Sequence, residues 1–288
     1  MATVAGYGHQ KSPCPGEGGL AMNEETQNAP GVTAEGVSRK GWVKKFSLLN
    51  NGNPWVCQDV FEWLWRNSDR FVPHNAKWYL CKIEREKAPW HHVQYDQSRI
   101  AVDAATIGAM YFSILGFEQE PLPATDPRNL NIVRHGHWHL DFDAQQEDIT
   151  PALLDLRKLL FELLPSYGVN PNVVPVYYSG GKGFHATVFN TILGTQDGSN
   201  ILPHIYKEMA AEFGKKLKTL DQGIYKTGLG QLYRIPNISR KLKGGVHKIP
   251  LQLSEVQEGG LTLEEIKTKA MKPRLIDLPA VPKSEVKQ

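Results

Sequence analysis

The sequence predicts a mixed protein of the α/β or α+β class, because strand patterns and helix patterns intermingle along the chain. The clearest strand pattern runs from His135 to Asp143, where apolar and polar residues alternate with a period of two. A helix pattern follows, with leucines at helical spacing from Leu153 to Leu163. Two more strand-like runs, at 173–178 and 184–189, flank a glycine-rich turn. Since no internal repeat is visible, we expect a single mixed domain.

Length and composition set the broad class of the protein. The 288 residues are 41% hydrophobic and 22% charged, which suits one large globular domain or two small ones. No apolar run is long enough to span a bilayer, and the first residues lack the apolar core of a signal peptide. The cysteines, Cys14, Cys57 and Cys81, are odd in number and not at metal-binding spacing. We therefore expect reduced thiols and a cytoplasmic protein with no membrane partner.

The N-terminal part combines a polar tail with an aromatic-rich globular pattern. Residues 1–40 are rich in Gly, Pro, Ser, Asn and Glu, which predicts a flexible tail. From Gly41 onward the pattern predicts a helix over 56–65, a strand over 77–83 and a buried helix over 100–115. We expect most of the tryptophans of this part in the core rather than stacked on bases.

The C-terminal part carries clear start and stop signals. Thr150 and Pro151 predict the start of a helix, and Pro165 and Gly168 predict its end. Further patterns predict a basic helix over 205–217, strands over 223–225, 232–235 and 247–251, and a last helix over 263–270. The proline-rich end, 271–288, predicts a second tail, so that the folded domain spans 41–270.

The strand His135–Asp143 carries the first candidate site. Its large apolar residues fall on one face, and on the other face three histidines precede Asp141 and Asp143. Neighbouring carboxylates on a strand repel each other, and a hard divalent cation removes that repulsion. We therefore predict a metal site at the two aspartates, on a strand that is half buried. An exposed edge strand ending in a turn is the alternative.

A glycine-rich loop, Ser179-Gly-Gly-Lys-Gly-Phe-His185, carries the second candidate site. It separates two predicted strands, whereas the phosphate loop of P-loop proteins opens a helix. Its glycines still allow main-chain N–H groups to approach an anion, and Ser179, Lys182 and His185 add side-chain donors. Because His185 alternates with apolar neighbours, we expect it to point away from the core. The loop therefore predicts a phosphate site, and a plain hairpin turn is the alternative.

The segment between Pro203 and Pro250 is strongly basic. Its Lys and Arg residues outnumber its acids, which favours a polyanion partner over a plain solvated surface. The basic residues are Lys207, Lys215, Lys216, Lys218, Lys226, Arg234, Arg240, Lys241, Lys243 and Lys248, against Glu208, Glu212 and Asp221. Arg234 has the fork geometry that binds a phosphate. Asp221 alone is a weak signal, since such a residue usually belongs to a turn.

Taken in order, these motifs resemble the archaeo-eukaryotic primase superfamily. The order is an Asp-x-Asp strand, Ser-Gly-Gly-x-Gly-x-His, a hydrophobic residue before Asp221, Arg-x-Pro at Arg234 and Lys-x-Pro at Lys248. The superfamily includes archaeal primase small subunits, plasmid and phage primase-polymerases, and the polymerase domains of bacterial repair ligases. The resemblance covers about residues 133–251. One departure is Ile238, where many members have a serine that here follows as Ser239.

The resemblance implies a fold, an activity and a set of site residues. The implied fold joins an N-terminal α/β module to an RRM-like catalytic module with a mixed or antiparallel sheet. The implied activity is that of a DNA primase or polymerase that makes or extends primers on single-stranded DNA from dNTPs or rNTPs. Implied roles are metal binding and catalysis for Asp141, Asp143 and Asp221, with two Mg²⁺ or Mn²⁺ ions; nucleotide binding for Ser179, Gly180, Gly181, Lys182, His185, Arg234 and Lys248; and DNA binding for Arg240, Lys241 and Lys243.

The resemblance also bears on partners and location. No zinc-binding cluster or helicase motor is visible in the sequence, so a helicase or another replication protein is an expected partner. The plasmid and phage members imply a nucleoid-associated protein encoded by a phage or plasmid.

Two other functions compete with this one. His137-Trp138-His139 fits the His-hydrophobic-His element of rolling-circle nicking enzymes, which pair it with a tyrosine nucleophile, here Tyr167, Tyr206 or Tyr225. That interpretation leaves the Asp-x-Asp pair and the glycine loop without a role. The second alternative is a non-catalytic module that only binds single-stranded DNA, and the intact acidic residues argue against it.

Overall fold

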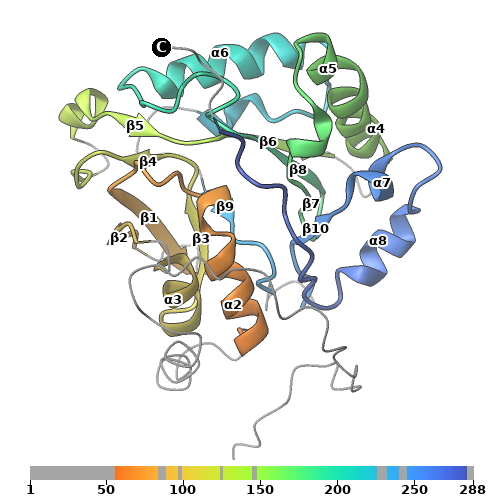
Figure 1. Cartoon of the computed structure of the whole chain (residues 1–288), viewed down its shortest axis with the longest axis horizontal. Helices are drawn as coiled ribbons and strands as arrows, with labels where there is room; N and C mark the ends of the chain where they lie inside the picture. The colour runs from red at the N-terminus through yellow and green to blue at the C-terminus, as the bar shows by residue number, and fades with distance from the viewer. Residues whose placement is uncertain are drawn as a thin grey trace, which may run out of the picture. The chain divides into compact units, whose positions relative to one another are not determined.

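The chain folds into two antiparallel sheets with helices packed against them (Figure 1). The computed structural model describes residues 56–83, 89–96, 99–123, 126–144, 148–225, 232–239 and 245–283, which all belong to the unit 46–288. The predicted tail over 1–40 lies outside the described residues, as do Arg240, Lys241 and Lys243. Within the described ranges every paired strand is antiparallel to its neighbour, which confirms the predicted α+β class.

The first sheet has strand order β5-β4-β1-β3-β9, with β2 paired to β1. Its strands are β1 (Trp78–Ile83), β2 (His91–Gln94), β3 (Ala109–Ser113), β4 (Gly116–Phe117), β5 (Arg134–His135) and β9 (Leu232–Arg234). Helices α2 (Gln58–Arg66) and α3 (Arg99–Thr106) pack on each other beside this sheet (Figure 1). The predicted helix over 100–115 is wrong in its second half, because Gly108, with φ at +71°, breaks the helix before β3 begins.

The second sheet has strand order β10-β7-β8-β6. Its strands are β6 (Trp138–Asp143), β7 (Val176–Tyr178), β8 (Gly183–Val188) and β10 (Ile249–Leu251). The remaining helices are α4 (Thr150–Lys158), α5 (Leu164–Ser166), α6 (Leu202–Gly214), α7 (Leu253–Val256) and α8 (Leu263–Lys269). A π-helical turn, η4 (Leu159–Leu163), joins α4 to α5, and the 3-10 turns are η2 (Ser68–Arg70), η3 (Pro127–Asn131), η5 (Pro171–Val173) and η6 (Gln222–Tyr225).

The predicted strand over 223–225 is wrong, because these residues form the 3-10 turn η6. The Asp221 carboxylate accepts a hydrogen bond from Gly223 N at 2.7 Å, which turns the chain there. Among the described residues, no helix is long and apolar enough to cross a membrane.

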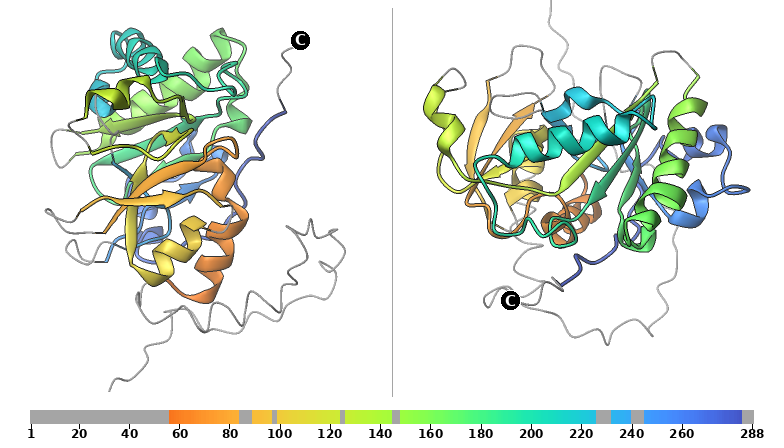
Figure 2. Two further views of the ribbon diagram at one scale, coloured as in Figure 1. Left: turned by 90° about the vertical axis from the view of Figure 1, so that its left-hand side faces the viewer. Right: turned by 90° about the horizontal axis from the view of Figure 1, so that it is seen from above.

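Both faces of strand β6 are buried, although its alternation predicts a half-buried strand. Trp138 and its apolar neighbours face helices α4 and α6, which lie over the second sheet (Figure 2), and the Trp138 and Phe213 rings are 5.1 Å apart. On the other face the side chains of His137 and His139 are also buried. The first sheet covers them, since Tyr233 of β9 lies 4.3 Å from His139 between ring centroids. Only the end of β6 that carries the aspartates reaches solvent.

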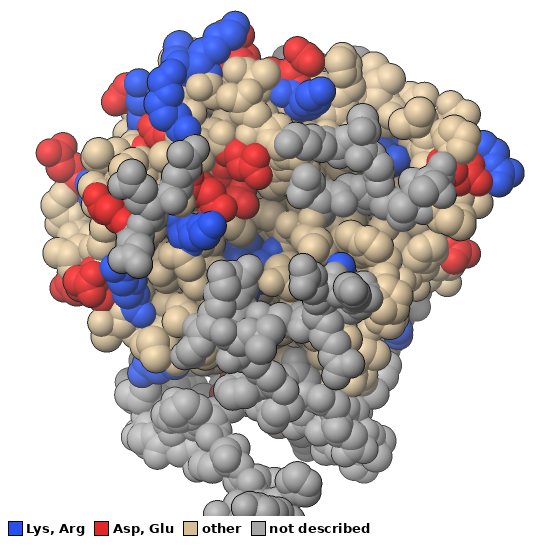
Figure 3. All heavy atoms as spheres, turned by 180° about the vertical axis from the view of Figure 1, so that it is seen from behind, with Lys and Arg blue, Asp and Glu red and all other residues tan. Residues whose placement is uncertain are grey.

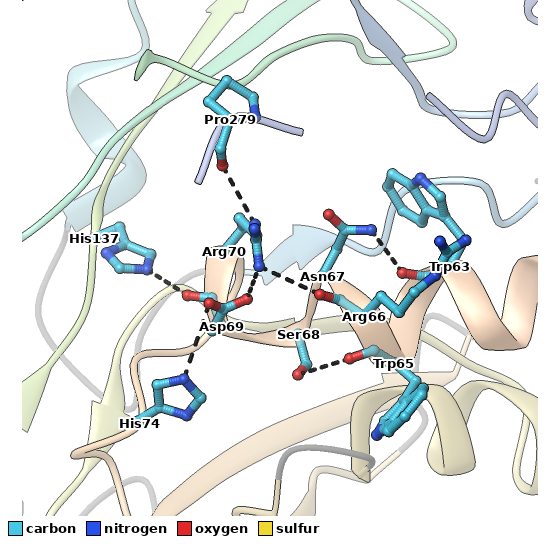
Figure 4. Close-up of polar contacts among 10 residues, drawn as sticks. All are labelled: Trp63, Trp65, Arg66, Asn67, Ser68, Asp69, Arg70, His74, His137 and Pro279. Carbon is cyan, nitrogen blue, oxygen red and sulfur yellow. Dashed lines mark hydrogen bonds and ion pairs between the residues drawn. The ribbon is translucent and has the colours of Figure 1, made fainter. Parts of the chain in front are cut away.

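The segment 271–283 has no helix or strand, and its main chain is bound to the N-terminal helices. Trp63 Nε1 donates to Ile276 O at 2.8 Å, and Arg70 Nε donates to Pro279 O at 3.3 Å. Figure 4 shows that the same turn, η2, also receives a hydrogen bond from His137, the residue before β6, on the Asp69 carbonyl. Turn η2 therefore ties the second sheet and this C-terminal segment to α2. The predicted domain boundaries at 41 and 270 stay predictions.

Candidate active site

Strand β6 is the last strand of its sheet, and the segment 219–225 runs along its free edge. Asp143 N donates to Thr219 O at 2.9 Å, and Asp221 N donates to Asp141 O at 2.8 Å. An isolated antiparallel bridge pairs Phe142 with Leu220, the residue between Thr219 and Asp221. Unpaired main-chain groups on a buried edge are costly, so this pairing is favoured. Its consequence is that Asp221 lies opposite Asp141, at the same end of the sheet as Asp143.

Two side chains that the sequence analysis did not single out hold this segment in place. The Tyr225 hydroxyl accepts from His139 N at 2.7 Å and donates to His139 O at 3.0 Å. On α4, Asp155 Oδ2 accepts from Thr219 N at 2.7 Å and from Thr219 Oγ1 at 2.9 Å. The one sequence signal for Asp155 is an acid placed within the leucine stripe of α4, which by itself does not name a partner.

The three predicted acids share one face of the second sheet at its open end. The Asp141 side chain is 24% exposed, and Asp143 and Asp221 are exposed. Figure 3 shows acidic side chains gathered near the middle of one face of the molecule, with Lys and Arg side chains around them. Three carboxylates supply the hard oxygen ligands that Mg²⁺ and Mn²⁺ prefer. Within the described residues, however, no three His, Cys, Asp or Glu side chains converge closely enough to hold a metal ion.

His185 lies directly opposite Asp141 on strand β8. It is on the non-apolar face, as predicted, but the first sheet covers that face and leaves His185 only 7% exposed, so its predicted position away from the core is wrong. Its Nε2 is 3.3 Å from Asp141 Oδ1. Burial lowers the pKa of His185, Lys248 lowers it further, and Asp141 raises it in part. The ring is therefore neutral at pH 7, and its Nε2 faces the Asp141 carboxylate.

The glycine-rich loop forms a tight turn between β7 and β8. Ser179 N donates to Gly183 O at 2.9 Å, and Gly183 N donates to Ser179 Oγ at 3.2 Å. Gly180 has φ at +73°, and a Cβ there would lie 2.5 Å from His247 O. The turn alone therefore explains Gly180, as the alternative of a plain hairpin turn predicts.

The turn also lies beside the acids. Gly183 pairs with Asp143 across β8 and β6, so the tip of the turn is at the open end of the sheet. Lys182 is exposed on this tip. The structure therefore brings together the Asp-x-Asp strand, Asp221, His185 and the glycine turn, which the sequence places in separate segments.

Arg234 and Lys248, which the resemblance places at the triphosphate, are buried behind the turn. Arg234 donates to the carbonyl oxygens of Ser179, Ile238 and Val246, at 2.8, 2.8 and 2.7 Å. Lys248 Nζ donates to Arg234 O at 2.9 Å and lies 3.4 Å from the centroid of the Tyr233 ring. Burial lowers the pKa of Lys248 well below its usual range. These contacts brace the glycine turn and the strands around it.

The histidines of the nicking-enzyme alternative lie in the interior. His137 Nε2 donates to Asp69 O at 2.9 Å, and its Nδ1 accepts from Asn190 N at 3.2 Å. Burial lowers the pKa of His137 to about 4. With both ring nitrogens in hydrogen bonds, His137 has no lone pair left for a metal. Tyr206 and Tyr225 are buried, and both hydroxyls bind main-chain carbonyls.

Comparisons with known proteins give little further information. No family model matches the chain, and no curated protein matches it. Among solved structures the chain is similar to the polymerase domain of Ligase D from Mycobacterium tuberculosis, in complex with DNA. The two are 13% identical, the match covers 77% of this chain and 90% of the other, and the TM-score is 0.40. A similarity this low does not by itself indicate a function.

Proposed function

We propose that this protein is a template-dependent nucleotidyltransferase that makes or extends primers on single-stranded DNA. The observation that carries the proposal is the pairing of segment 219–221 with β6, which aligns Asp221 with Asp141 beside Asp143 and next to the glycine turn. Acids from separate segments that meet beside an anion-binding turn suit phosphoryl transfer. The order of these motifs along the chain supports the same activity.

In this proposal Asp141, Asp143 and Asp221 hold two Mg²⁺ or Mn²⁺ ions. Such ions, when bound, activate the primer 3′-hydroxyl and neutralise charge on the triphosphate. The reaction forms a bond between the 3′-oxygen and the α-phosphorus, releases the hydroxyl proton to water, and breaks the bond to pyrophosphate, which leaves. Because strand pairing holds the main chains of the three acids, only their side chains have to change rotamer to converge on bound cations.

Some of the remaining site residues contact the nucleotide, and the others hold the site in place. Ser179, the turn glycines and Lys182 contact the triphosphate, since they surround the tip beside the acids. His185 orients Asp141 rather than touching the nucleotide, because its Nε2 is directed at that carboxylate. Arg234 and Lys248 support the turn from behind. A helicase or another replication protein as a partner remains a prediction.

The decisive experiment is an incorporation assay. The protein is incubated with Mn²⁺, labelled nucleotides and a single-stranded template, with and without an annealed primer, and the products are sized. Template-dependent products that disappear in Asp141→Ala and in Asp221→Ala are the expected result. Loss in Asp141→Ala but not in Asp221→Ala would contradict the three-acid site.

A second readout tests the cation site without catalysis. Calorimetric titration of Mn²⁺ into the wild-type protein should give saturable binding that Asp141→Asn and Asp143→Asn each weaken. DNA binding with neither cation binding nor incorporation would instead favour the non-catalytic alternative. A covalent protein–DNA adduct through a tyrosine would favour the nicking enzyme.

A further inference from the structure

A cavity of about 530 Å³ opens on the far side of the acids from the glycine turn. Asp143 and Asp221 line it together with Lys207 of α6, Lys218 and the other residues of the segment 219–223. The cavity therefore continues the candidate active site toward helix α6. Apart from Asp143 and Asp221, none of its lining residues has a role in the proposed function.

The order of the strands indicates which substrate would approach through this cavity. Across the open end of the sheet the glycine turn of β7 and β8 comes first, then Asp141 and Asp143 on β6, then Asp221 on the segment paired with β6. In phosphoryl transfer the attacking and leaving oxygens lie roughly in line on opposite sides of the phosphorus. If the leaving pyrophosphate lies at the glycine turn, the attacking 3′-hydroxyl must approach from the side of Asp221, where the cavity is.

We propose that Lys207 and Lys218 bind the primer strand, at the phosphates nearest its 3′ end. The proposal rests on the proposed function, because the direction of the primer follows from the place of the triphosphate. It adds a primer subsite formed by α6 and the segment that follows it.

The charge state of these two lysines suits such a subsite. Both are exposed, and among the residues that the structure describes neither has a carboxylate within ion-pair distance. Lys218 Nζ donates only to a main-chain carbonyl, that of Lys215. By contrast, Lys215 in the same region is paired with Glu212. The two ammonium groups offset the charges of Asp143 and Asp221 in the cavity, so that cations bound at the acids would leave a net positive charge for a phosphodiester strand.

The first test compares Lys207→Ala/Lys218→Ala with Lys215→Ala as the matched control. Affinity for a primer–template DNA is measured over a series of salt concentrations. For the double variant the slope of log K against log salt should decrease by about 0.7 to 0.9 for each lost phosphate contact. The Lys215→Ala control should keep the wild-type slope. An unchanged slope in the double variant would overturn the proposal.

The second test identifies the strand. Neutral methylphosphonates replace the last two phosphates of the primer or, in a separate DNA, the template phosphates opposite them. The primer substitution should weaken binding to the wild-type protein and have little further effect on the double variant. The template substitution should weaken both proteins equally. If only the template substitution loses its effect in the double variant, the lysines bind the template and the proposal is wrong.

These outcomes separate the inference from the proposed function. Incorporation by the wild-type protein, with an unchanged salt slope in the double variant, would overturn the primer subsite and leave the polymerase intact. A reduced slope with the expected strand effect, but no incorporation under any cation or nucleotide, would support strand binding and count against the polymerase.

Discussion

Asp141 and His185 form the pair on which the site depends. They face each other across β6 and β8, and the His185 ring also lies 4.8 Å from the Tyr233 ring of the first sheet, between centroids. The alternation of β8 correctly separates His185 from its apolar neighbours. It does not reveal that a second sheet covers the other face, which is why a residue expected to contact phosphate is directed at a carboxylate instead.

Replacement of His185 tests this positioning role. His185→Ala removes the N–H directed at Asp141 and should lower incorporation by about 10- to 100-fold, as for other residues that orient metal-binding carboxylates. It should also raise the Mn²⁺ concentration needed for half-maximal activity. His185→Gln, which retains an N–H donor, should recover part of both. Unchanged Mn²⁺ dependence together with weaker nucleotide binding would return His185 to a phosphate-binding role.

A second residue-scale prediction concerns Gly180. Gly180→Ala places a side chain at positive φ and 2.5 Å from His247 O, so both strain and a clash are expected. Gly194→Ala is the matched control, since φ there is +68° but no atom lies within 4 Å of the new Cβ. Urea unfolding should show a loss of about 1–2 kcal/mol in the control and a clearly larger loss in Gly180→Ala. Equal losses would mean that the turn is not packed as described.

At the scale of elements, the segment 219–225 completes the site. Its main chain forms hydrogen bonds with the free edge of β6. Its position depends on Asp155 of α4 and on the Tyr225 hydroxyl. Helix α4 therefore helps to position Asp221. The helix packs on the second sheet, its Asp155 binds Thr219, and Asp221 follows Thr219 by two residues.

Asp155→Ala tests that link. The change removes two hydrogen bonds and should cost about 1–3 kcal/mol of unfolding free energy, with a large loss of incorporation because Asp221 is no longer held. Asp148→Ala is the control, because among the described residues Asp148 accepts hydrogen bonds only from Thr150 at the start of the same helix. It should cost about 1 kcal/mol and leave incorporation unchanged. Full activity in Asp155→Ala would show that Asp221 does not depend on this contact.

At the scale of the whole molecule, the two sheets enclose a row of histidines. His137, His139 and His185 are buried, and burial lowers the pKa of each below its ordinary value of 6.5. For His137 the folded value is about 4. As the pH falls below 6.5 the unfolded chain therefore takes up protons that the folded chain excludes, and stability is lost down to about pH 4.

This linkage predicts a measurable pH dependence of stability. Between pH 6.5 and pH 4 the unfolding free energy should fall by up to about 1.4 kcal/mol per pH unit for each such histidine. Urea titrations at several pH values measure it. His137→Gln should reduce the slope, while His204→Gln, at an exposed position, should not. A slope that His137→Gln leaves unchanged would contradict the buried neutral state of His137.

The sequence by itself determined the α+β class, most helices and strands, and the identity of the acidic and glycine-rich motifs. These features follow from local periodicity and turn chemistry, which act over a few residues. The helix α4 is an example, since it begins at Thr150, next to Pro151, and buries Leu153 and Leu156 as predicted, although Ile149 rather than Thr150 is its N-cap residue.

Only the tertiary structure decided that both faces of β6 are buried and which residues support the site. Strand periodicity distinguishes two faces but does not report whether another sheet covers the second one. Several features of the site depend on contacts between segments that are far apart in the chain. They are the burial of His139, Arg234 and Lys248, and the contact of Asp155 with Thr219. Asp221 is placed by the need of an edge strand for hydrogen-bond partners, which is a property of the folded sheet and not of any local sequence pattern.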